Sequence, residues 1–129
     1  MTERRTIVIA DDNLQIRMLV KAALASLGHE LVEAVDGEQA LDVVTTHPPD
    51  LLLLDVNMPK LDGWEVLHFM RRRPETAAVP VMMLTTEAQV WDLKRAASLG
   101  CDDYLIKPFA PRELKERVGH ILEGWSADS

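Results

Sequence analysis

The sequence predicts an α/β domain in which strands and helices alternate around one parallel sheet. Five short apolar runs bounded by turn residues are typical of strands. These runs are Thr6–Ala10, Glu30–Val35, Asp50–Leu54, Pro80–Leu84 and Asp103–Ile106. The first, third and fourth are almost continuously apolar, as in strands that are covered on both faces. Strict alternation with helices implies right-handed crossovers and a doubly wound (βα)5 sandwich.

The first helix follows the first apolar run. Its apolar residues repeat with the helical period, at Ile16, Leu19, Val20, Ala23, Leu24 and Leu27. Asn13 stands where an N-cap is needed, and Gly28 stands where a left-handed residue would end the helix. We therefore expect a helix between Asn13 and Gly28.

The last helix repeats this apolar stripe near the end of the chain. Pro111 suits the first helical turn, because its missing N–H would have no partner there. The stripe comprises Leu114, Val118, Ile121, Leu122 and Trp125. Weaker patterns predict three further helices between the strands, over Gly37–Thr46, Trp64–Arg73 and Glu87–Ser98.

Length and composition indicate one domain with a core of its own. The chain has 129 residues, of which 47% are hydrophobic, so we expect a domain over residues 1–124 and a tail or the start of a linker over 125–129. A net charge of −7 argues against direct binding to nucleic acid or an anionic membrane. The apolar run Ile7–Ala10 is too short for a signal sequence or a membrane span. A single cysteine, Cys101, cannot form an internal disulfide, which favours a cytoplasmic protein.

Polar residues follow four of the five predicted strands. In an open parallel sheet the carboxyl ends of the strands meet at one edge, where ligands bind. The residues placed there are Asp11 and Asp12, Asp55, Thr85 and Lys107. Taken singly, each has an ordinary explanation, such as helix capping, a turn or a solvated lysine. Their joint placement is what predicts a functional site.

Three carboxylates at one edge would repel each other unless a cation neutralised them. Oxygen ligands without histidine or thiolate select a hard ion, and a few carboxylates with water suit Mg²⁺. Lys107 would add a positive charge for a further anion. A carboxylate held between Mg²⁺ and an ammonium is suited to phosphoryl transfer. We therefore expect Asp55 to be the nucleophile.

These residues resemble the receiver domains of bacterial two-component response regulators. The resemblance spans roughly residues 6–122 and implies a flavodoxin-like sheet of order 2-1-3-4-5. It rests on the acidic pair Asp11–Asp12, on the segment Leu54–Gly63 with its Met-Pro and Asp-Gly pairs, and on Tyr104–Phe109 with its lysine-proline turn.

The resemblance implies a role for each site residue. Asp12 and Asp55 would bind Mg²⁺ directly, Asp11 would act through water, and Asn57 would contribute its backbone carbonyl. Asp55 would accept the phosphoryl group, and the Lys107 ammonium and Thr85 hydroxyl would contact phosphoryl oxygens. Tyr104 would turn inward with Thr85 as the second switch residue, and Pro108 would follow a cis peptide bond.

The resemblance also implies a signalling domain rather than an enzyme. It would take its phosphoryl group from a histidine kinase, a phosphotransfer protein or a small phosphodonor, and would dephosphorylate itself. Phosphorylation would change the face built from the fourth helix, fifth strand and fifth helix, which a target protein, a fused output domain or a second copy would read. A stand-alone regulator and the N-terminal domain of a longer one both fit.

Two other classes of protein use similar residues. A Mg²⁺-dependent phosphatase of the haloacid dehalogenase type also has a strand-end aspartate, but it needs a second acidic residue two positions later, where this chain has Asn57. A flavodoxin-like FMN carrier needs a phosphate-binding loop after the first strand. Asp11 and Asp12 stand there instead and would repel phosphate.

Overall fold

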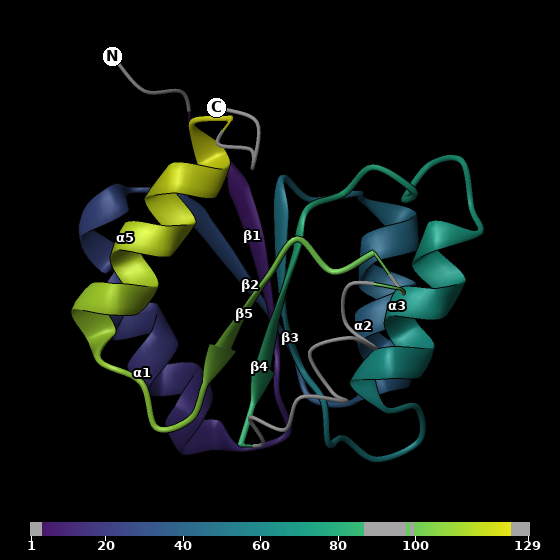
Figure 1. Cartoon of the computed structure of the whole chain (residues 1–129), viewed down its shortest axis with the longest axis horizontal. Helices are drawn as coiled ribbons and strands as arrows, with labels where there is room; N and C mark the ends of the chain where they lie inside the picture. The colour runs from purple at the N-terminus through teal and green to yellow at the C-terminus, as the bar shows by residue number, and fades with distance from the viewer. Residues whose placement is uncertain (1–3, 87–97, 99, 125–129) are drawn as a thin grey trace.

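A parallel sheet of five strands forms the centre of the computed structural model, which describes residues 4–86, 98 and 100–124 (Figure 1). Its strand order is β2-β1-β3-β4-β5, which confirms the predicted order 2-1-3-4-5 and the doubly wound fold. Every neighbouring pair of strands is parallel. The strands are β1 (Thr6–Ala10), β2 (Glu30–Ala34), β3 (Leu51–Asp55), β4 (Val81–Thr85) and β5 (Asp103–Ile106).

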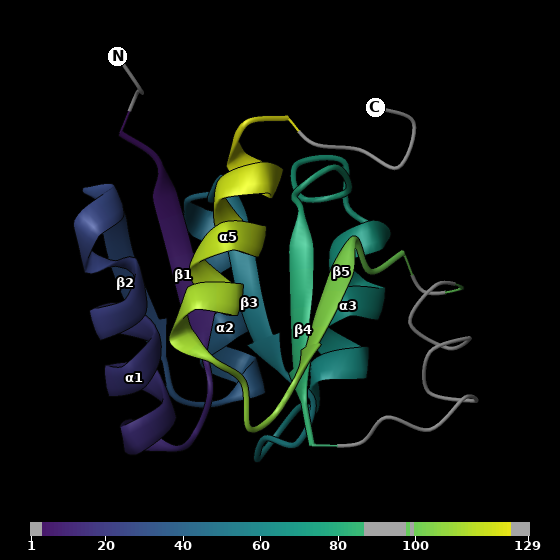
Figure 2. The ribbon, with the colours of Figure 1, turned by 60° about the vertical axis from the view of Figure 1, so that its left-hand side comes forward.

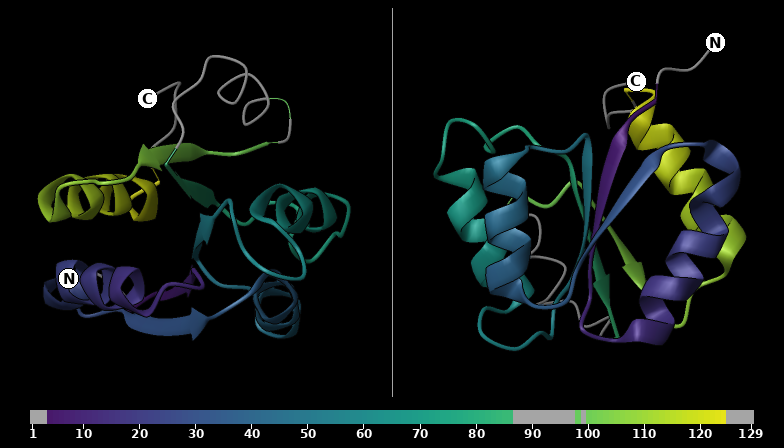
Figure 3. Two further views of the ribbon diagram at one scale, coloured as in Figure 1. Left: turned by 90° about the horizontal axis from the view of Figure 1, so that it is seen from below. Right: turned by 180° about the vertical axis from the view of Figure 1, so that it is seen from behind.

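Helices cover both faces of the sheet, as Figures 1 and 3 show. One face carries α1 (Leu14–Leu24), which continues into a short 3-10 helix over Ala25–Leu27, and α5 (Pro111–Leu122). The other face carries α2 (Gly37–Thr46) and α3 (Gly63–Arg71). The helix predicted over Glu87–Ser98 and the tail predicted over 125–129 lie outside the described residues, apart from Ser98.

The helix ends follow from local side chains. The Asn13 side chain accepts a hydrogen bond from the Ile16 amide, and Gly28 has φ = 75°, so both predicted boundaries of the first helical segment are confirmed. The α3 helix begins one residue before the predicted start. Asp62 and Glu65 form a capping box there, in which each side chain accepts from the other residue's amide.

Two apolar cores flank the sheet, because alternate strand residues point to opposite faces. In β3, Leu52 and Leu54 face the core under α2 and α3, whereas Leu51 and Leu53 face the core under α1 and α5. All four leucines are fully buried. The central strands are therefore covered on both sides, as their apolar sequences predicted.

The predicted apolar stripe of the first helix is confirmed except at Leu19, since its other five residues lie in or against the core under α1 and α5. Leu19 was expected in the buried stripe, but it is 37% exposed. Arg17 lies with Val20 and Leu24 on the buried side of the helix instead. Arg17 can lie on this side because its guanidinium has a carbonyl and a carboxylate partner there.

The strands run in one direction, so the sheet has one edge formed by their carboxyl ends and an opposite edge formed by their amino ends (Figure 2). The carboxyl ends of all five strands lie at one edge, and the first and last described residues lie towards the other. No helix in the described part of the chain is long and apolar enough to cross a membrane. The carboxyl edge is where the predicted site residues gather.

Candidate metal and phosphoacceptor site

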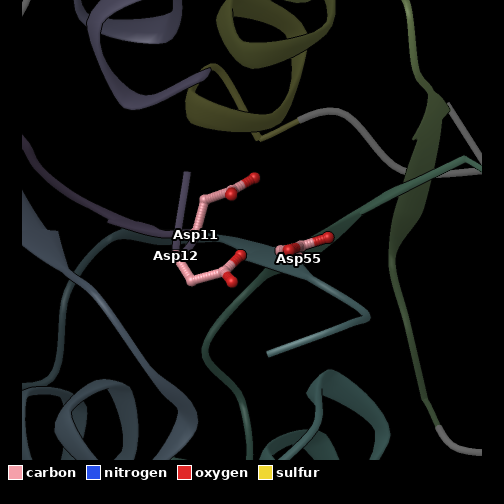
Figure 4. Close-up of side chains that lie close together, drawn as sticks. All are labelled: Asp11, Asp12 and Asp55. Carbon is pink, nitrogen blue, oxygen red and sulfur yellow. The ribbon is translucent and has the colours of Figure 1, made fainter. Parts of the chain in front are cut away.

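Three aspartates meet where β1 and β3 end (Figure 4). Asp55 is the last residue of β3, and Asp11 and Asp12 follow β1 directly. One carboxylate oxygen from each can be chosen so that all three lie within 4.8 Å of one another. Asp11 is fully buried, Asp55 is 5% exposed, and Asp12 is exposed. The predicted acidic cluster is therefore present, with one carboxylate open to solvent.

Lys107 lies across two of these carboxylates. Its Nζ donates to Asp11 Oδ2 at 2.7 Å and to Asp55 Oδ1 at 3.1 Å. Burial on its own would lower the pKa of Lys107, but the hydrogen bond and charge of Asp11, together with the charge of Asp55, raise it overall. Lys107 therefore stays charged and partly neutralises the cluster. Its predicted contact with a phosphoryl oxygen stays a prediction.

The surroundings of Asp55 disfavour the ionised form of its carboxyl group. Burial raises its pKa most, and the charge of Asp11 raises it further. Lys107 and a hydrogen bond from the Asn57 amide act in the opposite direction but do not outweigh these effects. Ionised Asp55 would therefore gain from an additional cation.

The loop after Asp55 is fixed by close backbone packing. A side chain on Gly63 would place its Cβ 2.3 Å from the Asp55 carbonyl oxygen. A Cβ on Gly37, at the start of α2, would lie 1.8 Å from the Leu61 carbonyl oxygen. Both distances are far below van der Waals contact, so only glycine fits at either position. These contacts position the loop that carries Asn57.

The predicted switch residues stand on neighbouring strands. Thr85 ends β4 and is 9% exposed, and its carbonyl accepts from the Lys107 amide. Tyr104, in β5, is partly buried and packs against the core under α2 and α3. The Lys107–Pro108 peptide bond is cis. Thr85 and Lys107 thus lie together where β4 and β5 end, and Tyr104 lies two residues before that end, opposite Met83.

Two arginines with important contacts were not identified from the sequence. Arg17 donates to the Asp11 carbonyl oxygen at 2.8 Å and to Glu33 Oε1 at 2.9 Å. The one sequence signal was its position three residues before Val20, which places Arg17 on the same side of α1 as this apolar residue. Arg71 lies in the last turn of α3, where a basic side chain is ordinarily solvated. Instead it donates to carbonyls in two loops at the amino edge, including those of Val79 and Gly100. Nothing local in the sequence indicates those distant partners.

Cys101 and His29 have local structural roles. Burial raises the pKa of the Cys101 thiol to about 11, so it is not a reactive thiolate at neutral pH. His29 Nδ1 accepts a hydrogen bond from the Arg5 amide. Neither side chain is part of the acidic cluster.

The donor atoms fit a small hard cation. The acidic cluster supplies carboxylate oxygens only, and one of its members, Asp12, is open to the water that Mg²⁺ retains when it binds to proteins. Burial and then the charge of Asp11 raise the pKa of Asp55, and Lys107 does not outweigh these two effects. The residues present are therefore compatible with Mg²⁺.

Comparison with known proteins identifies the family. Residues 7–119 match the family model described as the response regulator receiver domain. The chain therefore belongs to the receiver domains of response regulators, the signalling domains of two-component systems, as the resemblance predicted.

Relatives and solved structures agree with this assignment. The chain is 40% identical over 119 residues to the protein named "Probable transcriptional regulator ycf27" of Cyanophora paradoxa. It is 41% identical over 118 residues to the alkaline phosphatase synthesis transcriptional regulatory protein PhoP of Bacillus subtilis. Each alignment covers 92% of this chain but 48% of the relative, so the chain spans about half the length of these curated relatives.

Two solved structures share the whole fold. The chemotaxis response regulator CheY4 of Vibrio cholerae has a TM-score of 0.86 at 29% identity, with 92% of this chain and 99% of that chain covered. The receiver domain of the Francisella response regulator 1452 has a TM-score of 0.87 at 30% identity, with 94% and 98% covered.

Proposed function

We propose that this domain is a phosphorylation-dependent switch in which Asp55 accepts a phosphoryl group with Mg²⁺ bound by the acidic cluster. One observation supports this most directly. Asp55 ends a buried strand with a lysine ammonium 3.1 Å from one oxygen and the oxygens of Asp11 and Asp12 within 4.8 Å. This arrangement provides a nucleophile, a counter-charge and a set of cation ligands in one place.

The chemistry is a single displacement at phosphorus. An Asp55 carboxylate oxygen would attack the phosphorus of the donor, the bond from phosphorus to the donor would break, and the donor would leave with that electron pair. When bound to Asp12, Asp55 and the Asn57 carbonyl, Mg²⁺ would neutralise charge on the phosphoryl oxygens. Lys107 would exchange its contact with Asp55 for one with a phosphoryl oxygen. Water would later attack the phosphorus, the bond between phosphorus and the Asp55 oxygen would break, and inorganic phosphate would leave as the carboxylate is restored.

The conformational response would start at Thr85. Its hydroxyl would contact a phosphoryl oxygen and draw the end of β4 towards Asp55, and the Tyr104 ring would move inward. Tyr104 is partly buried against the core under α2 and α3, so its ring retains some exposure that it could lose. Solvent access to the ring should fall when the phosphate analogue beryllofluoride is added with Mg²⁺, and an unchanged ring environment would refute this step.

The partners follow from the family. A histidine kinase or a phosphotransfer protein would supply the phosphoryl group in the cytoplasm. A fused output domain, a separate target protein or a second copy would read the face that contains β5 and α5. The matched relatives named as transcriptional regulators are about twice as long as this chain, whereas CheY4 of Vibrio cholerae is matched over 99% of its chain, so a fused output domain and a separate target protein both fit.

Phosphorylation by a small donor tests the proposal. With acetyl phosphate and Mg²⁺, intact mass spectrometry should show one added phosphoryl group, stable to acid and labile to base. Asp55→Asn should abolish this gain. Asp50→Asn is the matched control, because Asp50 precedes the same strand at the opposite edge, and it should be phosphorylated normally. Full phosphorylation of Asp55→Asn would refute the assignment of the nucleophile.

The family assignment favours this function over the two alternatives. A haloacid dehalogenase-type phosphatase would need an acid at Asn57, and a flavin carrier would need a phosphate loop where Asp11 and Asp12 stand. An aspartate without a neighbouring general acid is better suited to holding a phosphoryl group than to rapid turnover.

A further inference from the structure

Arg17 makes contacts that suit a role in the acidic cluster, although it is not one of the ligands. Its side chain is 11% exposed, which is unusual for an arginine and requires partners. Nη1 donates to the Asp11 carbonyl oxygen at 2.8 Å, and Nε donates to Glu33 Oε1 at 2.9 Å. The guanidinium thus links α1, β2 and the loop that carries the acidic pair.

The Asp11 carbonyl belongs to the peptide that joins Asp11 to Asp12. That peptide is planar, so holding its oxygen also determines where the Asp12 nitrogen and Cα lie. On the other side of Asp11, its amide donates to the Ala34 carbonyl at 3.1 Å. Arg17 and β2 together therefore fix the backbone from which both carboxylates project.

Asp12 depends on this backbone more than Asp11 does. The Asp11 carboxylate has its own anchors, since Oδ1 accepts from the Asn13 amide and Oδ2 accepts from Lys107. Within the described part of the chain, the Asp12 carboxylate has neither a hydrogen-bond nor an ion-pair partner. The backbone between Asp11 and Asp12 is therefore the main determinant of where the Asp12 carboxylate lies.

We propose that Arg17, oriented by Glu33, is a positioning residue for the metal site, because it holds the Asp11–Asp12 peptide so that Asp12 faces Asp55. The inference rests on the proposed Mg²⁺ site. It differs from a purely electrostatic role, because a positive charge this close to the cluster would by itself weaken cation binding.

Positioning and charge predict opposite effects, which allows a direct test. Calorimetric titration with Mg²⁺ alone, on the unphosphorylated chain, would measure the Kd. If Arg17 positions Asp12, Arg17→Gln should raise the Kd about tenfold, the lower end of the usual effect of removing a group that orients a metal ligand. If Arg17 acts only through its charge, the same change should lower the Kd.

A second variant keeps the charge. Arg17→Lys cannot reach both Asp11 and Glu33 with a planar fork, so it should raise the Kd by about threefold, whereas a charge-only role predicts no change. Lys21→Gln is the matched control. Lys21 pairs with the other oxygen of Glu33 at 3.1 Å and has no contact with Asp11, so its loss should leave the Kd unchanged.

Separate outcomes would contradict the two proposals. Urea unfolding without Mg²⁺ would establish that each variant is folded under the titration conditions. A wild-type chain that does not bind Mg²⁺ would overturn the proposed metal site and this inference with it. A wild-type chain that binds Mg²⁺, with an unchanged or lower Kd in both Arg17 variants, would overturn this inference alone, even if the variants were less stable.

Discussion

Replacing Lys107 by methionine should destabilise the metal-free protein strongly. The change would remove a charge that is 13% exposed and pairs with two carboxylates that are 0% and 8% exposed. Asp11 and Asp55 would then face each other without a counter-charge. Breaking a buried ion pair by removing one partner costs about 3–5 kcal/mol, and because this site is partly open we expect about 3 kcal/mol.

The pH dependence of this loss has a definite sign. The pKa of Lys107 is raised, so its stabilising contribution is complete below the ordinary lysine value of 10.5 and is lost only as the pH rises through the higher folded value. Neutral pH therefore shows the full effect. Without Lys107 the pKa of Asp55 should rise further, so acidification would protonate Asp55 and reduce the deficit.

Urea unfolding at pH 7 in EDTA would measure the effect, and Mg²⁺ should bring the variant most of the way back to the stability that the wild type has in EDTA. At a concentration one hundred times the Kd, a ligand adds about 2.7 kcal/mol to the free energy of unfolding. Lys21→Met is the control, because its partly exposed pair with Glu33 should contribute at most about 1 kcal/mol. If Lys107→Met lost no more stability than Lys21→Met in EDTA, the reasoning about the buried cluster would be wrong.

Two further changes test the surroundings of the site. Because burial and Asp11 raise the pKa of Asp55, ionised Asp55 destabilises the fold above that pKa. Asp55→Asn should therefore raise the melting temperature in EDTA at pH 7, by an amount that shrinks as the pH falls; a lower melting temperature at pH 7 would contradict this. Gly37→Ala would place a Cβ 1.8 Å from the Leu61 carbonyl oxygen and should cost about 2 kcal/mol in urea unfolding, whereas no loss would mean that the loop can move aside.

The sequence was sufficient to predict the sheet and its functional edge. Continuously apolar runs such as Leu51–Leu54 can be identified because a strand covered on both faces has no polar alternation. Asp55 and Lys107 could be placed at one edge because parallel strands share a direction. The predicted ranges of β3 and β4 each began and ended one residue early, because Asp55 and Thr85 are polar yet belong to the strands.

The remaining features depend on contacts between distant parts of the chain. The bond from Lys107 to Asp11 joins residues 96 positions apart, and no local pattern indicates that the ammonium would bind the carboxylates themselves. Arg17 was missed for a related reason. Helical periodicity predicts which side of a helix is apolar, but it cannot show that a carbonyl beneath the helix will accept from a buried guanidinium.

The four leucines of β3 do little to define the register of this strand in the sheet. Sliding Leu51–Leu54 by one position would present almost the same surface to both cores, so these residues hardly distinguish one register from the next. Asp50 precedes this leucine run and Asp55 follows it, and a slip in either direction would draw one of these carboxylates deeper between the helix layers at a large cost in solvation. Asp55, the proposed phosphoacceptor, therefore also helps to determine the register of the central strand.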